Sequence, residues 1–382
     1  MAIDRLCLRN FLMFTGCKIK DFEQYPQDRT AEAKENGPSK FENELTVESF
    51  DETFIDGINF FLGANATGKT SLLKCIYAAC EYSNQATAPN QARLFYDYFS
   101  SSKRFVWEIY HKENGDDYGS VRAFSGENEF RFVTWNSASE LRDWSELGRK
   151  PVIPTSALEL RDWFELGIKS VLIPTAEMLS HSKGLIAMSL KWDIPFDATQ
   201  TDILVNAQLP GTKEITNRNK KILGMISDTI GGEVVYENDT FYVVKTDGLR
   251  VEFSLEAEGF RKLGLLWKLI RNGLLECGSV LLWDEPEASI NPELMPLLVD
   301  ILYILKNDGV QIFIASHSYL LAKYIDIKKE SESDVLFISL YKNEAGEIKT
   351  ARAKNYSLLE RNPIEKAEES LFNAVVAKSM GG

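Results

Sequence analysis

The fold of this chain is decided by one stretch, Gly63-Ala64-Asn65-Ala66-Thr67-Gly68-Lys69-Thr70. It matches the pattern GxxxxGK[ST], whose glycines let main-chain N–H groups turn inward around phosphate oxygens. The apolar run 58–62 precedes the motif, and an apolar helical pattern follows it from Leu72. A strand, a glycine turn and a helix are the parts of an α/β nucleotide-binding unit. The sequence therefore predicts a phosphate site between a buried strand and a helix.

Each position of this motif has an expected role at the phosphate site. The start of the helix adds partial positive charge, the lysine reaches the β- and γ-phosphates, and the last hydroxyl binds Mg²⁺. We therefore expect ATP and Mg²⁺ as ligands, with Lys69 on the phosphates and Thr70 on the metal. The residues expected to contact the nucleotide are Gly63, Asn65, Ala66, Thr67, Gly68, Lys69, Thr70 and Ser71.

A second apolar strand, residues 280–283, ends in adjacent carboxylates. Next to a phosphate loop this pattern predicts a metal ligand, Asp284, followed by a residue that orients or deprotonates the attacking water, Glu285. Glu287 is a second candidate for the metal, ranked below Glu285.

A third apolar strand, residues 312–315, leads to His317, one of only three histidines. A histidine at the end of such a strand is able to donate to a γ-phosphate oxygen and to respond to its loss. The alternative is a histidine that only caps a turn. His111 and His181 have no comparable surroundings, and we expect them to be structural or exposed.

The composition narrows the classes of function. Acidic residues outnumber basic ones by 56 to 43, for a net charge of −13, and such a charge repels a phosphate backbone over any broad surface. Hydrophobic residues make up 44%, which is enough for a large core. The five cysteines form no CxxC pair, so neither a zinc cluster nor a disulfide framework is expected.

Targeting and membrane segments are not expected. Residues 1–14 contain charged side chains and no long apolar core, unlike a signal peptide. No run of about 18 uncharged apolar residues occurs. We therefore expect a cytoplasmic protein that does not interact with membranes.

We expect a single domain over 1–382 that carries two insertions. The polar residues 21–50 form the first predicted insertion. The second, 137–175, is a helical segment with a near-repeat, SASELRDWSELGRKPVIPT followed by SALELRDWFELGIKSVLIPT, whose end resembles a core strand. Short strands between 104 and 135 predict an antiparallel flap, 233–256 predicts a three-stranded meander, and a helix is expected over 259–275.

Taken in order, the phosphate loop, the run LLWDEPEASINP and the run FIASHS resemble an ABC-type ATPase head. They are most similar to the branch of RecF, SMC, Rad50 and OLD-like proteins, described as AAA15/AAA21 ATPases, and residues 8–11 resemble that branch's first strand. The resemblance covers roughly residues 1–335. It implies a P-loop α/β fold with a mixed sheet, an antiparallel β flap and Mg²⁺-dependent ATP hydrolysis.

The resemblance also implies a site that is shared between two heads. In that branch, a signature loop of one head completes the ATP site of the other, and the matching loop here contains Gly259. The usual serine of the loop is Ala257, for which Arg261 or Lys262 is an expected substitute. The alternative is a plain strand–helix corner. No glutamine matches the Q-loop; Thr175 or Glu177 occupies that region.

Two functions follow from this resemblance. The first is an ATPase that dimerises, or forms a higher homo-oligomer, around ATP and gates a separate effector such as a nuclease. This is similar to the ATPase subunits of bacterial antiphage systems such as Septu or PARIS. Expected relays to the effector are the two insertions, with Trp144 and Trp163 as docking residues or, alternatively, as the buried side of a hairpin.

The second function is a RecF-like DNA-repair ATPase that binds DNA directly. Its expected basic face would consist of Arg218, Lys220, Lys221, Lys328 and Lys329. A transporter ATPase is disfavoured because both the signature loop and the Q-loop region depart from that class.

Overall fold

The computed structural model describes residues 3–9, 14, 50–84, 98–99, 118–135, 163, 166–192 and 194–380, leaving aside residues 164–165 and the other gaps between these ranges. Most of the two predicted insertions, 21–50 and 137–175, lies outside the described residues, as do Trp144, His111 and the expected strand at 104–111.

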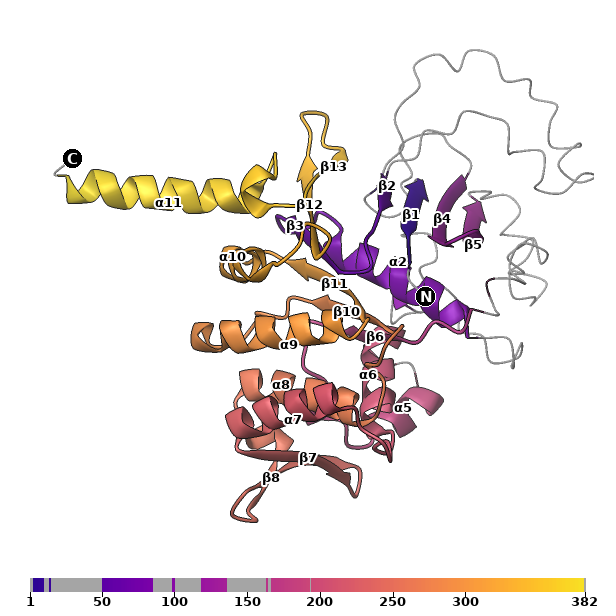
Figure 1. Ribbon diagram of the computed structural model, residues 1–382. Helices are drawn as coiled ribbons and strands as arrows, with labels where there is room; N and C mark the ends of the chain where they lie inside the picture. The colour runs from indigo at the N-terminus through magenta and orange to yellow at the C-terminus, as the bar shows by residue number, and fades with distance from the viewer. Residues whose placement is uncertain are drawn as a thin grey trace, which may run out of the picture.

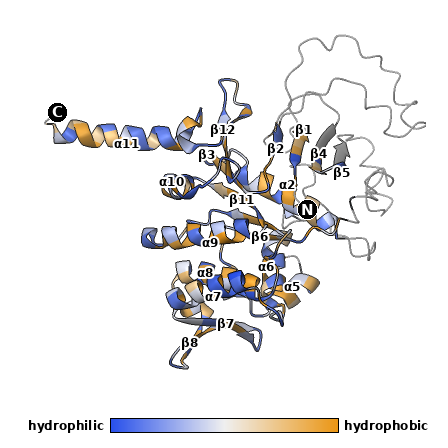
Figure 2. Ribbon diagram, viewed as in Figure 1, coloured by the Kyte–Doolittle hydropathy of each residue, from blue (hydrophilic) through white to orange (hydrophobic). Residues whose placement is uncertain are grey.

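A mixed central sheet organises the fold (Figure 1). All neighbouring strands are parallel except the pair at one edge, β12 and β13. In spatial order the strands are β13 (Ile348–Ala353), β12 (Val335–Lys342), β3 (Ile58–Gly63), β11 (Gln311–Ser316), β10 (Val280–Asp284) and β6 (Ser170–Ile173). β3 and β11 are buried along their whole length, as expected for inner strands covered on both faces, and Figure 2 shows β11 in the hydrophobic colour.

Helices cover both faces of this sheet. On one face, α2 (Lys69–Tyr82) buries Leu72, Leu73 and Ile76 among outward residues of the strands, including Phe313 of β11. The other face is covered by α8 (Glu258–Arg271), α9 (Met295–Asn307) and α10 (Tyr319–Lys328). Because neighbouring residues of a strand point to opposite faces, Phe60 and Phe61 belong to different core clusters.

The predicted antiparallel flap is a separate sheet in the order β2-β1-β4-β5. Its strands are β1 (Arg5–Arg9), β2 (Phe50–Thr53), β4 (Tyr118–Ser125) and β5 (Asn128–Trp135). The first strand of the chain therefore pairs with the flap, and residue 50, placed in the polar insertion by the sequence, begins a strand of it.

The helical side of the molecule lies at the far end of the sheet from β13. It contains α5 (Leu185–Lys191), α6 (Ala198–Gln208) and α7 (Asn217–Ile230), followed by the meander β7 (Gly232–Glu237), β8 (Thr240–Lys245) and β9 (Arg250–Glu252). Asn238 and Asp239 both have positive φ, as a tight turn between antiparallel strands requires. Short 3₁₀ turns occur at η6 (Leu179–His181), η7 (Phe253–Leu255), η8 (Pro292–Leu294) and η9 (Tyr356–Leu358).

The chain ends in α11 (Pro363–Ser379), which projects from the body beside β12 and β13 (Figure 1). No described helix is both long and apolar enough to cross a membrane. The mixed sheet, the phosphate-loop strand and helix, and the flap confirm the predicted α/β P-loop architecture.

Candidate functional site

The phosphate-binding loop lies where the sequence places it, between β3 and α2 at the carboxyl end of the central sheet. Helical bonding begins with the Leu72 N–H, which donates to the Gly68 carbonyl, so the preceding N–H groups lie at the open end of the helix. Gly68 has a φ of 93°, which favours glycine, and Ala66 also has positive φ. A Cβ at Gly63 would lie 2.6 Å from the Leu340 carbonyl oxygen, so the neighbouring strand leaves no room for a side chain.

Lys69 is folded back onto this loop. Its Nζ donates to the carbonyl oxygens of Gly63 at 2.8 Å and Ala64 at 3.0 Å, and the side chain is 7% exposed. Burial lowers the pKa of Lys69, while the carboxylates of Glu285 and Asp284 oppose this shift. Two carbonyls thus hold the ammonium at the position from which it would exchange them for phosphate oxygens.

The loop meets the end of β10 through one carboxylate. Asp284 Oδ2 accepts hydrogen bonds from Thr70 Oγ1 at 2.9 Å and from Thr175 Oγ1 at 3.0 Å. Burial raises the pKa of Asp284, with the two hydroxyls opposing the shift. The structure therefore brings together the two residues predicted to bind the metal, and Thr175, one of the two Q-loop candidates, reaches the same carboxylate.

These oxygens suit a hard divalent cation. Mg²⁺ prefers oxygen ligands and is usually held by one or two protein groups together with phosphate and water. Thr70 and Asp284 supply a hydroxyl and a desolvated carboxylate whose charge a cation would compensate. Among the described residues no group of three or more His, Cys, Asp and Glu side chains forms a metal site of its own.

Glu285 is held in an unusual main-chain conformation. Its φ is 49°, its N–H donates to the Ala315 carbonyl at 2.8 Å, and its own carbonyl accepts from Lys262 Nζ at 3.3 Å. Its Oε1 lies 3.0 Å from Nδ1 of His317. The ring predicted to contact the γ-phosphate is thus placed against the carboxylate expected to act on water.

Glu287, the second candidate for the metal, is hydrogen-bonded to the end of β11. Its Oε1 accepts from Ser316 Oγ at 2.7 Å and from the His317 N–H at 3.4 Å. Burial raises its pKa. In this structure Glu287 joins the loop after β10 to the end of β11.

The predicted signature loop begins α8, and Gly259 has a local reason to be glycine. A Cβ there would lie 2.7 Å from the Ser289 carbonyl oxygen of the same chain. Ala257 and Glu258 are exposed, whereas Gly259 is buried. The exposed start of α8 therefore includes Ala257 and Glu258, and close packing within the chain already requires Gly259.

The two cations expected to replace the signature serine point back into their own chain. Arg261 Nε lies 3.5 Å from Glu177 Oε2. Lys262 is 1% exposed, and Glu258, Glu287 and Glu285 oppose the lowering of its pKa by burial. Both cations are therefore engaged within their own chain, and the expectation that one of them substitutes for the serine in a second head stays a prediction. The sequence offered no indication of the contact between Lys262 and Glu285.

Glu177, the other Q-loop candidate, is hydrogen-bonded through its side chain to the start of the 3₁₀ turn η6. Its Oε1 accepts from the N–H groups of Leu179 at 2.5 Å and Ser180 at 3.2 Å, and it faces Arg261. Trp163, considered for docking, is also internal: its side chain is 0% exposed, and Nε1 donates to the Ala79 carbonyl at 2.9 Å. The docking interpretation of Trp163 is wrong, because the ring lies in the core beside α2.

Most of the basic residues considered for DNA already have partners. Arg218 pairs with Asp308 at 2.6 Å, Lys328 pairs with Asp300 at 2.5 Å, and Lys329 donates to the Lys354 carbonyl at 2.8 Å. These contacts weaken the expected basic face.

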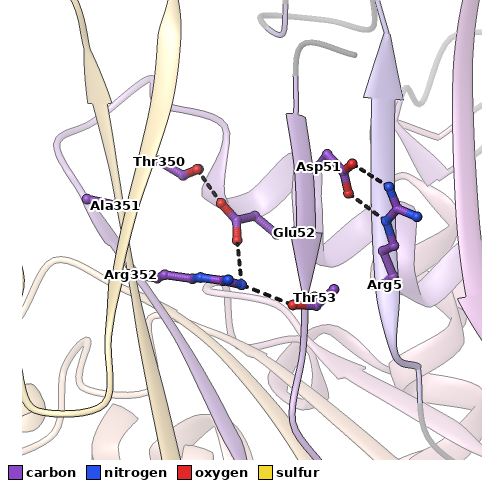
Figure 3. Close-up of a pocket in the computed structure, with 7 residues that line it drawn as sticks. All are labelled: Arg5, Asp51, Glu52, Thr53, Thr350, Ala351 and Arg352. Atoms are coloured by element: carbon purple, nitrogen blue, oxygen red, sulfur yellow. Dashed lines mark hydrogen bonds and ion pairs between the residues drawn. The ribbon is translucent and has the colours of Figure 1, made fainter. Parts of the chain in front are cut away.

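A separate hollow of about 490 Å³ lies between β2 and β13 (Figure 3). Arg5 pairs with Asp51, and Glu52 lies between Thr350 and Arg352, with 3.8 Å to the Arg352 Nη1 atom. In the register of the sheet, Thr350 of β13 pairs with Leu340 of β12, which pairs with Gly63 of β3. The hollow is therefore two strands away from the phosphate loop. Because each arginine faces a carboxylate, the hollow has balanced charge and does not resemble a phosphate site.

Residues 174–323 match the family described as "AAA domain, putative AbiEii toxin, Type IV TA system". The matched range contains Thr175, Gly259, Asp284, Glu285 and His317 and begins after the phosphate-binding loop. No curated protein matches the sequence.

The solved structures that the chain resembles include SMC heads. It is 12% identical, with a TM-score of 0.48, to an SMC head bound to the C-winged helix domain of ScpA, over 92% of this chain and 98% of that one. It is also 12% identical to the SMC head domain from Thermotoga maritima, with a TM-score of 0.44, over 92% of this chain and 99% of that one. A third structure is the Pyrococcus furiosus SMC head with an extended coiled coil, bound to the C-terminal domain of ScpA. The chain is 11% identical to it, with a TM-score of 0.48, over 97% of this chain and 99% of that one. Since each TM-score is below 0.5, these likenesses carry no argument about what the chain does.

Proposed function

We propose that this chain, an ABC-type ATPase head of the branch that contains SMC and Rad50 proteins, binds and hydrolyses ATP with Mg²⁺, closes with a second head around the nucleotide, and so controls a separate effector. The observation that carries the proposal is the 2.9 Å hydrogen bond between Thr70 and Asp284. It joins the phosphate loop to the carboxylates of β10, which lie more than 200 residues later in the chain.

The residues around this contact have complementary chemical roles. Lys69 and the N–H groups at the start of α2 bind the phosphates, while Thr70 and Asp284 hold Mg²⁺, which would neutralise charge on the phosphate oxygens. Glu285 orients the attacking water and accepts its proton, and His317 holds the Glu285 carboxylate in place.

Closure of two heads is the second part of the proposal. Its support is the exposed start of α8, where Ala257 and Glu258 face solvent at the open end of a helix. Such an end stabilises phosphate charge when another chain presents it. Gly259 would act indirectly, by allowing this end of α8 to pack against Ser289.

The effector part rests on resemblance and on the family description, which names a toxin–antitoxin system. We place the chain in bacterial antiphage defence, with the effector, a nuclease, as a separate protein. The RecF-like alternative gains no support from the paired basic residues described above.

The test measures the mass of Glu285→Gln in solution by light scattering, with and without ATP–Mg²⁺. We expect a step from the nucleotide-free mass to a doubled mass, because binding is kept while hydrolysis is stopped. Lys69→Ala should lose ATP binding and show no step. The measurement is made at a protein concentration at which the nucleotide-free chain is monomeric, and a Glu285→Gln mass that ATP leaves unchanged there would overturn the shared site.

Ala257→Trp separates closure from nucleotide binding by a single head. Ala257 is exposed, so the ring is accommodated in one chain but blocks close approach of a second. We expect ATP binding at wild-type affinity without the ATP-dependent step. Gly259→Asp is a poor test, because the clash with Ser289 would disturb α8 itself.

A further inference from the structure

Within the part of the chain that the structure describes, the last helix, α11, is fixed to the body at its beginning. Asn362 caps it by accepting from the N–H groups of Ile364 at 3.2 Å and Glu365 at 3.4 Å, and Ser339 donates to the Arg361 carbonyl at 2.9 Å. Ile364 packs against the main core cluster. Beyond this turn the helix runs out into solvent (Figure 1), so its direction is set by a firm base while most of its length is uncovered.

One face of α11 is apolar along this exposed length. Ala367, Leu371 and Val375 follow Ile364 at helical spacing, and Figure 2 shows hydrophobic residues distributed along the helix. Leu371 is 61% exposed and Val375 58% exposed. In proteins, most of the stability of a helix comes from packing of its apolar face. An uncovered apolar face on such a helix therefore indicates a binding partner.

The charges of α11 select its partner. Three carboxylates, Glu365, Glu368 and Glu369, outnumber the one cation, Lys366, in its first half, and Lys378 lies in its last turn. A parallel copy would place the carboxylates beside each other, whereas an antiparallel copy places Lys378 beside the acidic end. We propose that α11 binds the α11 of a second copy of this chain as an antiparallel pair.

The sequence fixes the register of this pair. With Leu371 opposite Leu371 on the two-fold axis, Ala367 faces Val375 and Lys378 lies over the turn that carries Ile364 and Glu368. The alternation of small and large residues lets the two helices approach closely. Helix dipoles that run in opposite directions add a favourable contribution.

The pair is a tether and not a complete dimer interface. A helix of 17 residues is about 25 Å long, and one such pair buries less than the roughly 1,200 Å² of a standard stable interface. It nevertheless makes the encounter of two heads intramolecular, which raises their effective concentration. This role in ATP-driven closure rests on the proposed function, whereas the pairing itself requires no nucleotide.

The pairing is tested without nucleotide, by sedimentation of the full chain over a range of concentrations. We expect a reversible monomer–dimer equilibrium that Leu371→Glu/Val375→Glu shifts to monomer by at least tenfold in dissociation constant. Ser370→Glu/Asn373→Glu, which adds the same charge to the opposite side of the helix, should leave it unchanged. A monomeric wild type at every concentration, or equal dimerisation of both variants, would overturn the proposal.

Two further sets of variants, charge exchanges and single cysteines, test the register. Lys378→Glu should weaken the dimer, and adding Glu368→Lys should restore it. In a Cys17→Ser/Cys277→Ser background, Leu371→Cys should give an oxidised dimer and Asn373→Cys should not. A failure of charge restoration together with cross-linking at 373 would contradict the antiparallel register. These results are independent of ATP, so they distinguish loss of the tether from loss of the shared nucleotide site.

Discussion

Lys262 donates its Nζ to the main-chain carbonyl of Glu285, at 3.3 Å, and so links the start of α8 to the carboxylate expected to act on water. The contact is buried and faces several carboxylates. Because Glu285 has a φ of 49°, its conformation depends on such partners. The helix end that would meet a second head is thereby connected to the water-activating residue of its own head.

Replacement of Lys262 by Met should slow hydrolysis while ATP binding persists. A hydrogen bond from a charged donor contributes about 1.5–3 kcal/mol, which corresponds to roughly 10- to 100-fold in kcat. The measurement is steady-state hydrolysis with a parallel nucleotide-binding titration. Lys268→Met is the matched control, because Lys268 lies on the same helix and is also buried. A KM effect without a kcat effect would contradict the positioning of Glu285.

The two threonines on Asp284 should differ in their effect on metal. Thr70→Val removes a proposed Mg²⁺ ligand, whereas Thr175→Val removes only a hydroxyl that orients the carboxylate. Loss of that single hydrogen bond is worth about 1 kcal/mol, so Thr175→Val should raise the Mg²⁺ concentration for half-maximal hydrolysis about fivefold. Thr70→Val should raise it more, and Thr175→Ser should stay near wild type. Equal effects of the two valine variants would argue against separate roles.

Trp163 should matter for stability. Truncation of a buried Trp to Ala costs about 3–5 kcal/mol of unfolding free energy. Trp163→Phe keeps most of the packing and loses the hydrogen bond to the Ala79 carbonyl, at a cost of about 1 kcal/mol. Denaturant unfolding of both variants checks this order. A Trp163→Ala protein as stable as wild type would contradict the burial of Trp163 in the core.

Asp334 should make stability depend on pH in the acidic range. Burial alone would raise the pKa of Asp334, but Lys306 and the N–H groups of Ser331 and Glu330 outweigh it and hold the pKa below its usual value. Because the folded pKa is lower than the unfolded one, this stabilisation is present above about pH 4 and is lost as pH falls through the folded value. Thermal unfolding from pH 6 to 3 should show a smaller acid-induced loss for Asp334→Asn than for wild type. Parallel curves would contradict this assignment.

The sequence alone predicted correctly those elements in which a local residue pattern and a functional motif occur together. The phosphate loop, the strand ending at Asp284 and the strand before His317 each combine an apolar run with a polar end, and the structure brings all three to one edge of the sheet. The P-loop α/β fold is confirmed, and the match of residues 174–323 to an AAA domain family supports the resemblance. The roles of the individual site residues stay predictions.

Other features depend on contacts that a sequence pattern does not display. Lys262 resembles any helical lysine until α8 is packed against the loop after β10. Helices α5, α6 and α10 were not predicted, although Asp197 with Gln200 forms a capping box and Ser318 caps α10. These caps were available indications. Trp163 was ambiguous because charged and apolar residues are mixed around it in the sequence, and its burial is defined by contacts with α2 and with Phe130 of β5.

The position of β3 has a consequence for synthesis of the chain. Its neighbours in the sheet, β11 and β12, come from the last third of the sequence, so the strand that carries the phosphate loop has no partner when it leaves the ribosome. At a synthesis rate of about 5–20 residues per second, the apolar side chains of β3 stay unpaired for tens of seconds before β11 and β12 are made. We therefore expect the nascent amino-terminal part to need protection by chaperones, and a fragment ending before β11 to aggregate although it contains the complete phosphate loop.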